Sequence, residues 1–289
     1  MTRMQVSMLP DGRRLHLQDG PIDLIIGAEG EAEHVTRAYD VAQIRFSTVL
    51  DELCEELPLL RQPTDRLPQG AVASRMWRAT ADLAKNNFIT PMAAVAGSVA
   101  EEVLYAMLTV STLERAHVNN GGDIALYLAA GQTYRLAVAS PDATPKGQVQ
   151  IADTDPVRGI ATSGQGGRSF SFGIADSVTV LAATAAQADV AATLIANAVD
   201  LPGHPKIIRR PANSLQHDTD LGDRLVVTQV GRLTTDETEA ALIRGEAIAQ
   251  TMRAAGHIHA AALFLNGQSR LVGATTALDL IPQRILTHA

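Results

Sequence analysis

Residues 116–128 read AHVNNGGDIALYL, two apolar runs separated by Asn-Asn-Gly-Gly and followed by an acid. A two-residue hairpin turn needs only one Asn-Gly pair, because two residues with positive φ already reverse the chain. The extra glycine therefore suggests that something besides the turn lies against the backbone. The acid either caps its own turn or faces a ligand, and both interpretations stay open. The segment in question comprises Asn119, Asn120, Gly121, Gly122 and Asp123.

The composition around this segment is that of a globular protein. The chain has 289 residues, of which 46% are hydrophobic and 19% charged, enough for a large core. A formal net charge of −7 and the lack of a basic run argue against nucleic acid or an anionic membrane as partner. The one cysteine, Cys54, excludes an internal disulfide, and no signal sequence or membrane-spanning run is evident. We therefore expect a cytoplasmic protein without a membrane span.

Periodicity along the chain predicts an α+β fold. The first 29 residues alternate apolar and polar positions around two turns, which predicts a three-strand meander. Helical spacing follows from about 31 to 57, where Pro58 is expected to end the helix, and again from Pro91 to about 112. Strand and helix patterns then occupy 176–199 and 224–265. Because the two do not alternate strictly, we predict a two-layer fold with mainly antiparallel sheets packed against helices.

The predicted helix over residues 185–199 carries three polar residues on one face. Asp189, Thr193 and Asn197 are four apart, while their neighbours are Ala, Val, Leu and Ile. A solvent-exposed face normally carries Lys, Glu or Arg, and this helix has none. A buried carboxylate and hydroxyl need partners, and such oxygens suit Mg²⁺ or Ca²⁺. A plain solvated face is the alternative.

A glycine-rich segment, GIATSGQGGRS at 159–169, precedes that helix. Its glycines, its hydroxyls and the cation of Arg168 could present backbone N–H groups to phosphate oxygens. It is not a P-loop, because no Gly-Lys-Ser/Thr ends it, and an ordinary loop is the competing interpretation.

Other reactive residues give weaker signals. His117, just before the turn, could serve as a base. His257 and His259 would share one strand face but have no evident third metal ligand. Cys54 lies among acids, which disfavours a thiolate.

Four segments, in this order and at these separations, resemble the ApbE superfamily, and in detail its UPF0280 branch: HVNNGGDI, ATSGQGG, DSVTVLAA and AQADVAATLIANAV. The better known members of the superfamily are FAD-dependent, Mg²⁺-requiring flavin transferases. The resemblance covers about residues 90–200 through motifs and nearly the whole chain through the order of elements. It implies a single ApbE-like domain over residues 1–289 with a T-fold-like architecture.

The resemblance also implies roles for particular residues. In the transferases, the aspartate and threonine of Ala-Asp-x-x-x-Thr hold the metal beside the FAD pyrophosphate, which maps onto Asp189 and Thr193, with a backbone carbonyl at about Val95. The residues that match the nucleotide-binding segments are Gly97, Glu101, Asn119, Asn120, Gly121, Gly122, Thr162, Ser163, Gly164 and Arg168.

The sequence departs from the transferase pattern at two places. In AAVAGSVAE the family glycine is kept as Gly97, but the lysine is replaced by Ala96 and the tyrosine by Ser98. The transferases also carry His-Ile-Ile-Asp-Pro after Thr-Ser-Gly, whereas residues 166–176 contain neither histidine nor proline. A group close to the transfer chemistry is therefore missing or replaced.

Three functions stay open at this point. The first is a metal-dependent enzyme or binder for FAD or a related nucleotide, in which Asp123, His117 or Asp176 is the acid/base candidate. The second is a non-catalytic cofactor carrier or assembly protein. The third is a binder of a pterin-like heterocycle between subunits, which also leaves homo-oligomerisation as an expectation.

Overall fold

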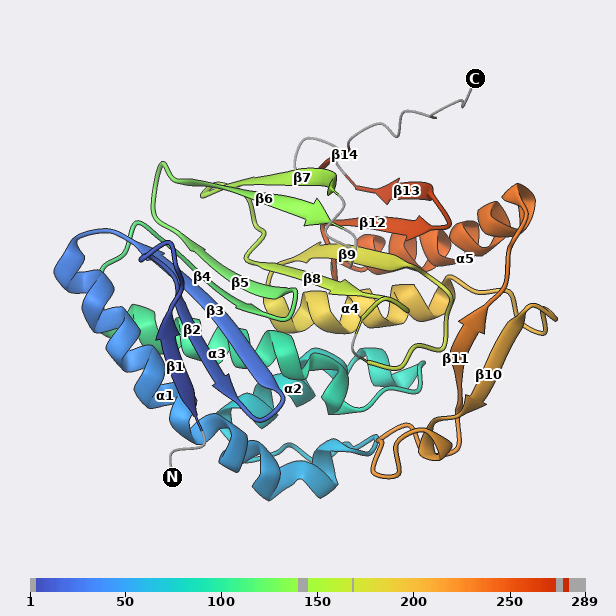
Figure 1. The fold of residues 1–289 in the computed structure, drawn as a ribbon, viewed down its shortest axis with the longest axis horizontal. Coiled ribbons are helices and arrows are strands. Elements are labelled where there is room, and N and C mark those ends of the chain that lie inside the picture. The colour runs from blue at the N-terminus through green and yellow to red at the C-terminus, as the bar shows by residue number, and fades with distance from the viewer. Residues whose placement is uncertain (1–3, 140–144, 168, 274–277, 281–289) are drawn as a thin grey trace.

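A large antiparallel sheet organises the computed structural model, which describes residues 4–139, 145–167, 169–273 and 278–280 (Figure 1). Among these residues, nine strands join in the order β1-β2-β3-β4-β5-β8-β9-β12-β13, and every neighbouring pair runs antiparallel. The described residues also form a three-stranded sheet, β14-β7-β6, and a two-stranded hairpin, β10-β11. The predicted α+β fold with mainly antiparallel sheets packed against helices is confirmed.

The strands of the large sheet are β1 (Gln5–Met8), β2 (Leu15–Asp19), β3 (Ile22–Glu29), β4 (Arg115–Asn120), β5 (Asp123–Leu128), β8 (Gly159–Ser163), β9 (Ser177–Ala182), β12 (Ala260–Leu265) and β13 (Gln268–Val272). The remaining strands are β6 (Thr133–Ala139), β7 (Pro145–Ala152), β10 (Ile207–Pro211), β11 (Leu225–Val230) and β14 (Leu278–Leu280). The α-helices are α1 (Ala32–Leu60), α2 (Ala71–Thr80), α3 (Val95–Val110), α4 (Ala185–Ala198) and α5 (Thr235–Ala254).

Helices cover one face of the large sheet along its length (Figure 1). One cluster of buried side chains lies between strands β2 to β5 and helices α1, α2 and α3. A second lies between β8, β9 and β12 and helices α4 and α5. On the opposite face, side chains of β6 and β7 pack against β5, β8, β9 and β12 as a third cluster. The alternation of side chains along each strand therefore decides which residues can meet α4.

Two helix boundaries differ from the sequence expectations. Helix α1 continues through Pro58 to Leu60, because a proline in the last turn removes one hydrogen bond without ending the helix. The segment expected to be helical from Pro91 opens as a short 3-10 helix over Pro91–Ala94, and α3 begins at Val95.

Among the described residues, Pro91–Val110 is long and apolar enough by length and composition to cross a membrane, with mean hydropathy 1.4; half of it is buried in the fold.

Glycines allow backbone to lie directly on helix α4. A Cβ added at Gly97 of α3 would come within 2.3 Å of the Ala185 carbonyl oxygen at the start of α4. One added at Gly159 of β8 would come within 2.1 Å of the Thr184 carbonyl. These two contacts fix the N-terminal end of α4 between the sheet and α3.

We expect Gly159→Ala to lower the free energy of unfolding by about 1–3 kcal/mol, since the added methyl group must displace main-chain atoms. Gly167→Ala is the matched control, because its added Cβ would meet only the Gly164 carbonyl oxygen, at 3.2 Å. Urea denaturation of both variants measures the difference. Equal stability of the two variants would contradict the close packing of β8 on α4.

Candidate functional site

The Asn-Asn-Gly-Gly segment forms a tight turn in which both glycines are required. Asn119 and Asn120 belong to β4, so the turn consists of Gly121 and Gly122, with φ of 66° and 112°. The Asn119 side-chain oxygen accepts a hydrogen bond from the Gly122 amide at 2.8 Å. A two-residue turn with positive φ at both positions explains the second glycine without a ligand. Nucleotide contact at this turn stays a prediction.

The residues flanking the turn lie on the sheet face that the helices cover. The Asn120 side-chain amide donates to the Ala96 carbonyl at the start of α3, at 3.2 Å. Asp123 pairs with Asn120 in the hairpin, and its carboxylate accepts a hydrogen bond from the Thr162 amide at 3.3 Å. The turn thus connects the sheet to α3 on one side and to β8 on the other.

The carboxylate of Asp189 on α4 also lies at the start of α3. Its carboxylate accepts a hydrogen bond from the Gly97 amide at 3.0 Å. Part of the residue stays accessible to solvent, yet protein atoms surround the carboxylate, and this desolvation raises the pKa of Asp189 well above its ordinary value. The nearby negative charge of Asp123 raises that pKa further, whereas the amides of Gly97 and Ala96 oppose the change. The structure therefore places the Asp123 carboxylate near enough to Asp189 for its charge to disfavour ionisation of Asp189.

The other two polar residues on this face of α4, Thr193 and Asn197, lie further along the helix than Asp189. Thr193 is half-buried one turn further along α4, and Val95, the expected carbonyl ligand, is the first residue of α3. Asn197 holds the loop before β9, because its side-chain oxygen accepts hydrogen bonds from the Phe172 amide at 2.9 Å and the Ser171 hydroxyl at 3.3 Å. The polar face of α4 thus accepts hydrogen bonds from protein groups at both ends, through Asp189 and Asn197.

The glycine-rich loop uses several of its amides internally. Those of Gln165, Gly166 and Gly167 donate to the carbonyls of Ala175, Asp176 and Gly164. Gly164 itself has φ of 145°, and an added Cβ would come within 2.8 Å of the Asp176 carbonyl oxygen. Arg168 lies outside the described residues.

Thr162 and Ser163 end strand β8 beside this loop. The Thr162 hydroxyl pairs with that of Thr179 at 2.9 Å, and its side chain lies on the sheet face opposite α4, since Ala161 next to it packs against the helices. The Thr162 amide, however, is the group that reaches Asp123. Ser163 is half-buried at the strand end.

Glu101 directs both carboxylate oxygens to protein groups. Oε1 accepts a hydrogen bond from the Ala186 amide in the first turn of α4 at 2.8 Å, and Oε2 pairs with Arg75 of α2 at 3.0 Å. These protein groups balance the charge of Glu101, so the predicted contact with a cofactor is not needed to explain a carboxylate at this position.

Of the three acid/base candidates, Asp123 is the one that lies beside Asp189. His117 of β4 shares its face with neither Asn120 nor Asp123 and hydrogen-bonds through Nδ1 to the Tyr134 hydroxyl of β6. Asp176 accepts a hydrogen bond from the Asn266 amide in the β12–β13 turn at 2.6 Å.

His117 is enclosed by neighbours. An added Cβ at Gly27 would come within 2.3 Å of its ring, so a glycine is needed there. Burial lowers the pKa of His117 to about 4, with a further contribution from the charge of Arg14, and burial raises the pKa of Tyr134 to about 12. The pair is neutral at pH 7.

Within the residues that the structure describes, no group of three or more His, Cys, Asp or Glu side chains could hold an ion. His257 lies 3.7 Å from an Asp82 carboxylate oxygen. Any ion at Asp123 and Asp189 would therefore take its other ligands from backbone, hydroxyl, water or substrate.

Comparison with known proteins identifies the family. A family model described as AbpE bacteria matches residues 6–271. The chain belongs to this family. A UPF0280 protein of Methanothermobacter thermautotrophicus is 38% identical over 115 residues, covering 39% of this chain and 44% of the relative. A UPF0280 protein of Methanococcus vannielii is 39% identical over 144 residues, covering 48% and 58%. The matched stretch thus spans about half the length of these curated relatives.

Solved structures of family proteins are similar only distantly. The apo flavinyl transferase ApbE of Pseudomonas stutzeri is 13% identical, with a TM-score of 0.45 and 93% of each chain covered. The flavin transferase ApbE of Vibrio cholerae is 14% identical, with a TM-score of 0.40 and coverage of 94% of this chain and 98% of that one. Site residues in this family member are therefore assigned from its own geometry.

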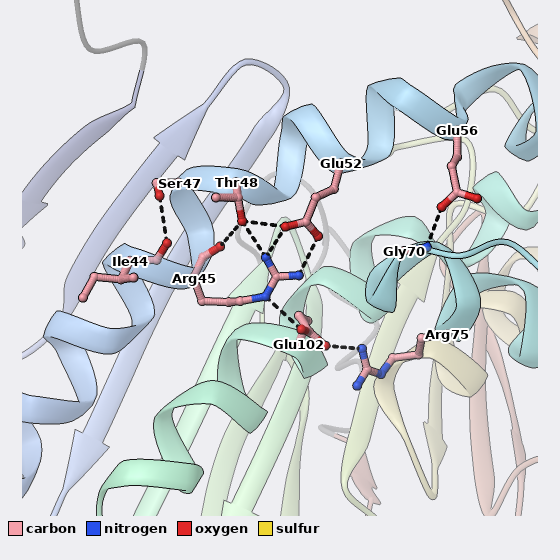
Figure 2. Close-up of polar contacts among 9 residues, drawn as sticks. All are labelled: Ile44, Arg45, Ser47, Thr48, Glu52, Glu56, Gly70, Arg75 and Glu102. Atoms are coloured by element: carbon pink, nitrogen blue, oxygen red, sulfur yellow. Dashed lines mark hydrogen bonds and ion pairs between the residues drawn. The ribbon is translucent and has the colours of Figure 1, made fainter.

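Sequence reasoning missed an ion-pair network beside the site. Figure 2 shows Arg45 of α1 meeting Glu52 of the same helix and Glu102 of α3, and Glu102 in turn meeting Arg75 of α2. Arg45 pairs with Glu52 at 2.7 Å and with Glu102 at 2.8 Å, and Arg75 pairs with Glu102 at 2.7 Å. The signal was the adjacent pair of acids in an otherwise apolar helix, which calls for cations on the neighbouring helices.

His117 makes stability sensitive to acid. Because the pKa of the folded-state imidazole is about 4 and that of the unfolded state about 6.5, its contribution is fully present above pH 6.5 and is lost as the pH falls toward 4. We expect this residue to account for up to about 2 kcal/mol of lost unfolding free energy between pH 7 and 5. His117→Asn should flatten that part of the urea-denaturation profile.

The exposed His217 supplies the matched control. His217→Asn should retain the acid dependence of the unmodified protein. An unchanged slope in His117→Asn would contradict the assignment.

Proposed function

We propose that this protein binds a divalent cation, with Mg²⁺ preferred, together with FAD or a related nucleotide, at Asp123 and Asp189. The single observation that supports this most is the juxtaposition of the two carboxylates, one of them desolvated. Like charges held together in protein are costly unless protonated or bridged by a cation. A bound cation would remove that repulsion.

The chemistry of the donor groups fits such an ion. Asp123 and Asp189 supply carboxylate oxygens, Thr193 a hydroxyl and Val95 a backbone carbonyl, with no thiolate or imidazole among them. Mg²⁺ is commonly bound by one or two carboxylates, with waters and substrate phosphates completing the shell. Soft-ligand metals are disfavoured by the same set.

The protein groups around the pair have separate tasks in this proposal. The amides of Ala96 and Gly97 fix the orientation of Asp189, and the Thr162 amide fixes that of Asp123. When bound, the ion would neutralise phosphate charge on the nucleotide. Family membership supports a flavin nucleotide, since the structurally similar proteins are named flavin transferases.

A non-catalytic carrier is the second candidate, and one observation favours it. The family lysine and histidine are absent from the chain at the corresponding places, where Ala96 and a histidine-free segment at 166–176 stand instead. Of the proposed acid/base groups, Asp123 lies at the site, while His117 and Asp176 contact protein elsewhere. Binding of a nucleotide therefore does not by itself imply transfer of a group from it.

Thermal unfolding with Mg²⁺ and FAD, FMN, ADP or a reduced pterin tests ligand binding. At about 100 times Kd, a site-specific ligand adds roughly 2.7 kcal/mol and raises Tm by about 5–10 °C. We expect a shift that requires both ion and nucleotide and is absent in Asp189→Asn and Asp123→Asn. The exposed Asp82→Asn is the matched control and should respond like the unmodified protein.

Without ligand, Asp189→Asn should be as stable as the unmodified protein or more so at pH 8, because the desolvated charge is removed. Absence of a shift with every ligand, or an equal shift in Asp189→Asn, would reject the proposal. Mass spectrometry of the bound ligand then separates a carrier, which returns FAD intact, from an enzyme that cleaves it.

A further inference from the structure

Glu101 connects two helices that hold the proposed site. It lies on α3, one turn after Gly97, and its Oε1 accepts the Ala186 amide in the first turn of α4. In the opposite direction, the Gly97 amide of α3 donates to Asp189 of α4. Each helix therefore donates one backbone hydrogen bond to a carboxylate of the other, next to the close contact of Gly97 with Ala185.

This exchange constrains the part of α4 that carries Asp189. The N-terminal amides of a helix lack partners within the helix and carry partial positive charge. In α4 the Thr184 hydroxyl accepts the Gln187 amide and Glu101 accepts the Ala186 amide. Asp189 lies three residues after Ala186, so a shift of that turn would move its carboxylate relative to Val95 and Asp123.

Arg75, a member of the ion-pair network, pairs with Oε2 of Glu101 at 3.0 Å. Within that network, which spans α1, α2 and α3, the acids Glu52, Glu101 and Glu102 outnumber the cations Arg45 and Arg75. The side chain of Glu101 is 18% exposed, so a surplus charge there requires a partner. The positive end of α4 supplies it.

We propose that Glu101 is a positioning residue for the metal site: by binding the first turn of α4, it sets where Asp189 stands relative to Asp123 and Val95. This inference rests on the proposed function, since it assigns Glu101 to the same site. It differs from the sequence prediction, which gave Glu101 direct contact with the cofactor.

Three variants test the role. Glu101→Ala removes the acceptor, Glu101→Gln keeps an oxygen for the Ala186 amide, and Glu102→Gln alters the adjacent acid, which pairs with Arg45 and Arg75. Calorimetric titration with Mn²⁺, first alone and then with FAD present, gives the affinity of each variant. We expect Glu101→Ala to bind about 10–100 times more weakly, as for other groups that orient ligands. Glu101→Gln should recover most of that loss.

Glu102→Gln is the matched control, because it weakens the network without touching α4. It should lower stability while leaving Mn²⁺ affinity within about threefold of the unmodified protein, less than the loss typical of an orienting group. Equal losses of affinity in Glu101→Ala and Glu102→Gln, or no loss in Glu101→Ala, would overturn the inference.

Hydrogen exchange provides a readout that does not need the metal. In Glu101→Ala, peptides covering residues 184–190 should exchange faster, whereas in Glu102→Gln they should exchange as in the unmodified protein. Unchanged exchange in Glu101→Ala overturns the positioning role. Failure of the unmodified protein to bind Mn²⁺, with or without nucleotide, rejects the metal site, and the exchange result then decides separately whether Glu101 fixes α4.

Discussion

The contact between α3 and α4 at Gly97 is the constraint on which the site depends. Because this residue has no side chain, the backbone of α3 lies directly on the Ala185 carbonyl, and the Gly97 amide reaches Asp189. Any larger residue would push α4 away from α3 and from the turn between β4 and β5. The lack of a side chain at Gly97 therefore determines both how closely α3 packs on α4 and where Asp189 is held.

Electrostatics explains why this arrangement is unusual for a purely structural core. The negative charge of Asp123 disfavours ionisation of the desolvated Asp189, so placing the two carboxylates together costs free energy when both are charged. The backbone amides of Gly97 and Thr162 donate hydrogen bonds to the two carboxylates, and such amides orient a carboxylate without carrying a full charge. The nearby arginines Arg45 and Arg75 are occupied by Glu52, Glu101 and Glu102.

The sequence predicted the elements better than their contacts. Alternation and helical spacing located the meander, α1, α4 and α5, because those patterns reflect burial on one face. Residue spacing did not show that β4 extends through Asn120, which leaves Gly121 and Gly122 as the two residues of the turn. His117 and Asp176 were named with Asp123 as acid/base candidates, but strand alternation places His117 on the opposite sheet face, and Asp176 accepts a hydrogen bond from the Asn266 amide of the β12–β13 turn. The juxtaposition of Asp123 and Asp189 is a long-range contact, which local patterns do not encode.

The departures from the family pattern leave this scaffold intact. Ala96 and Ser98 replace family side chains, yet the backbone amides of residues 96 and 97 still orient Asp189, because a backbone group does not depend on the residue type. Gly97, by contrast, has no substitute. Replacement of the family lysine by Ala96 therefore leaves unchanged the backbone geometry that orients Asp189.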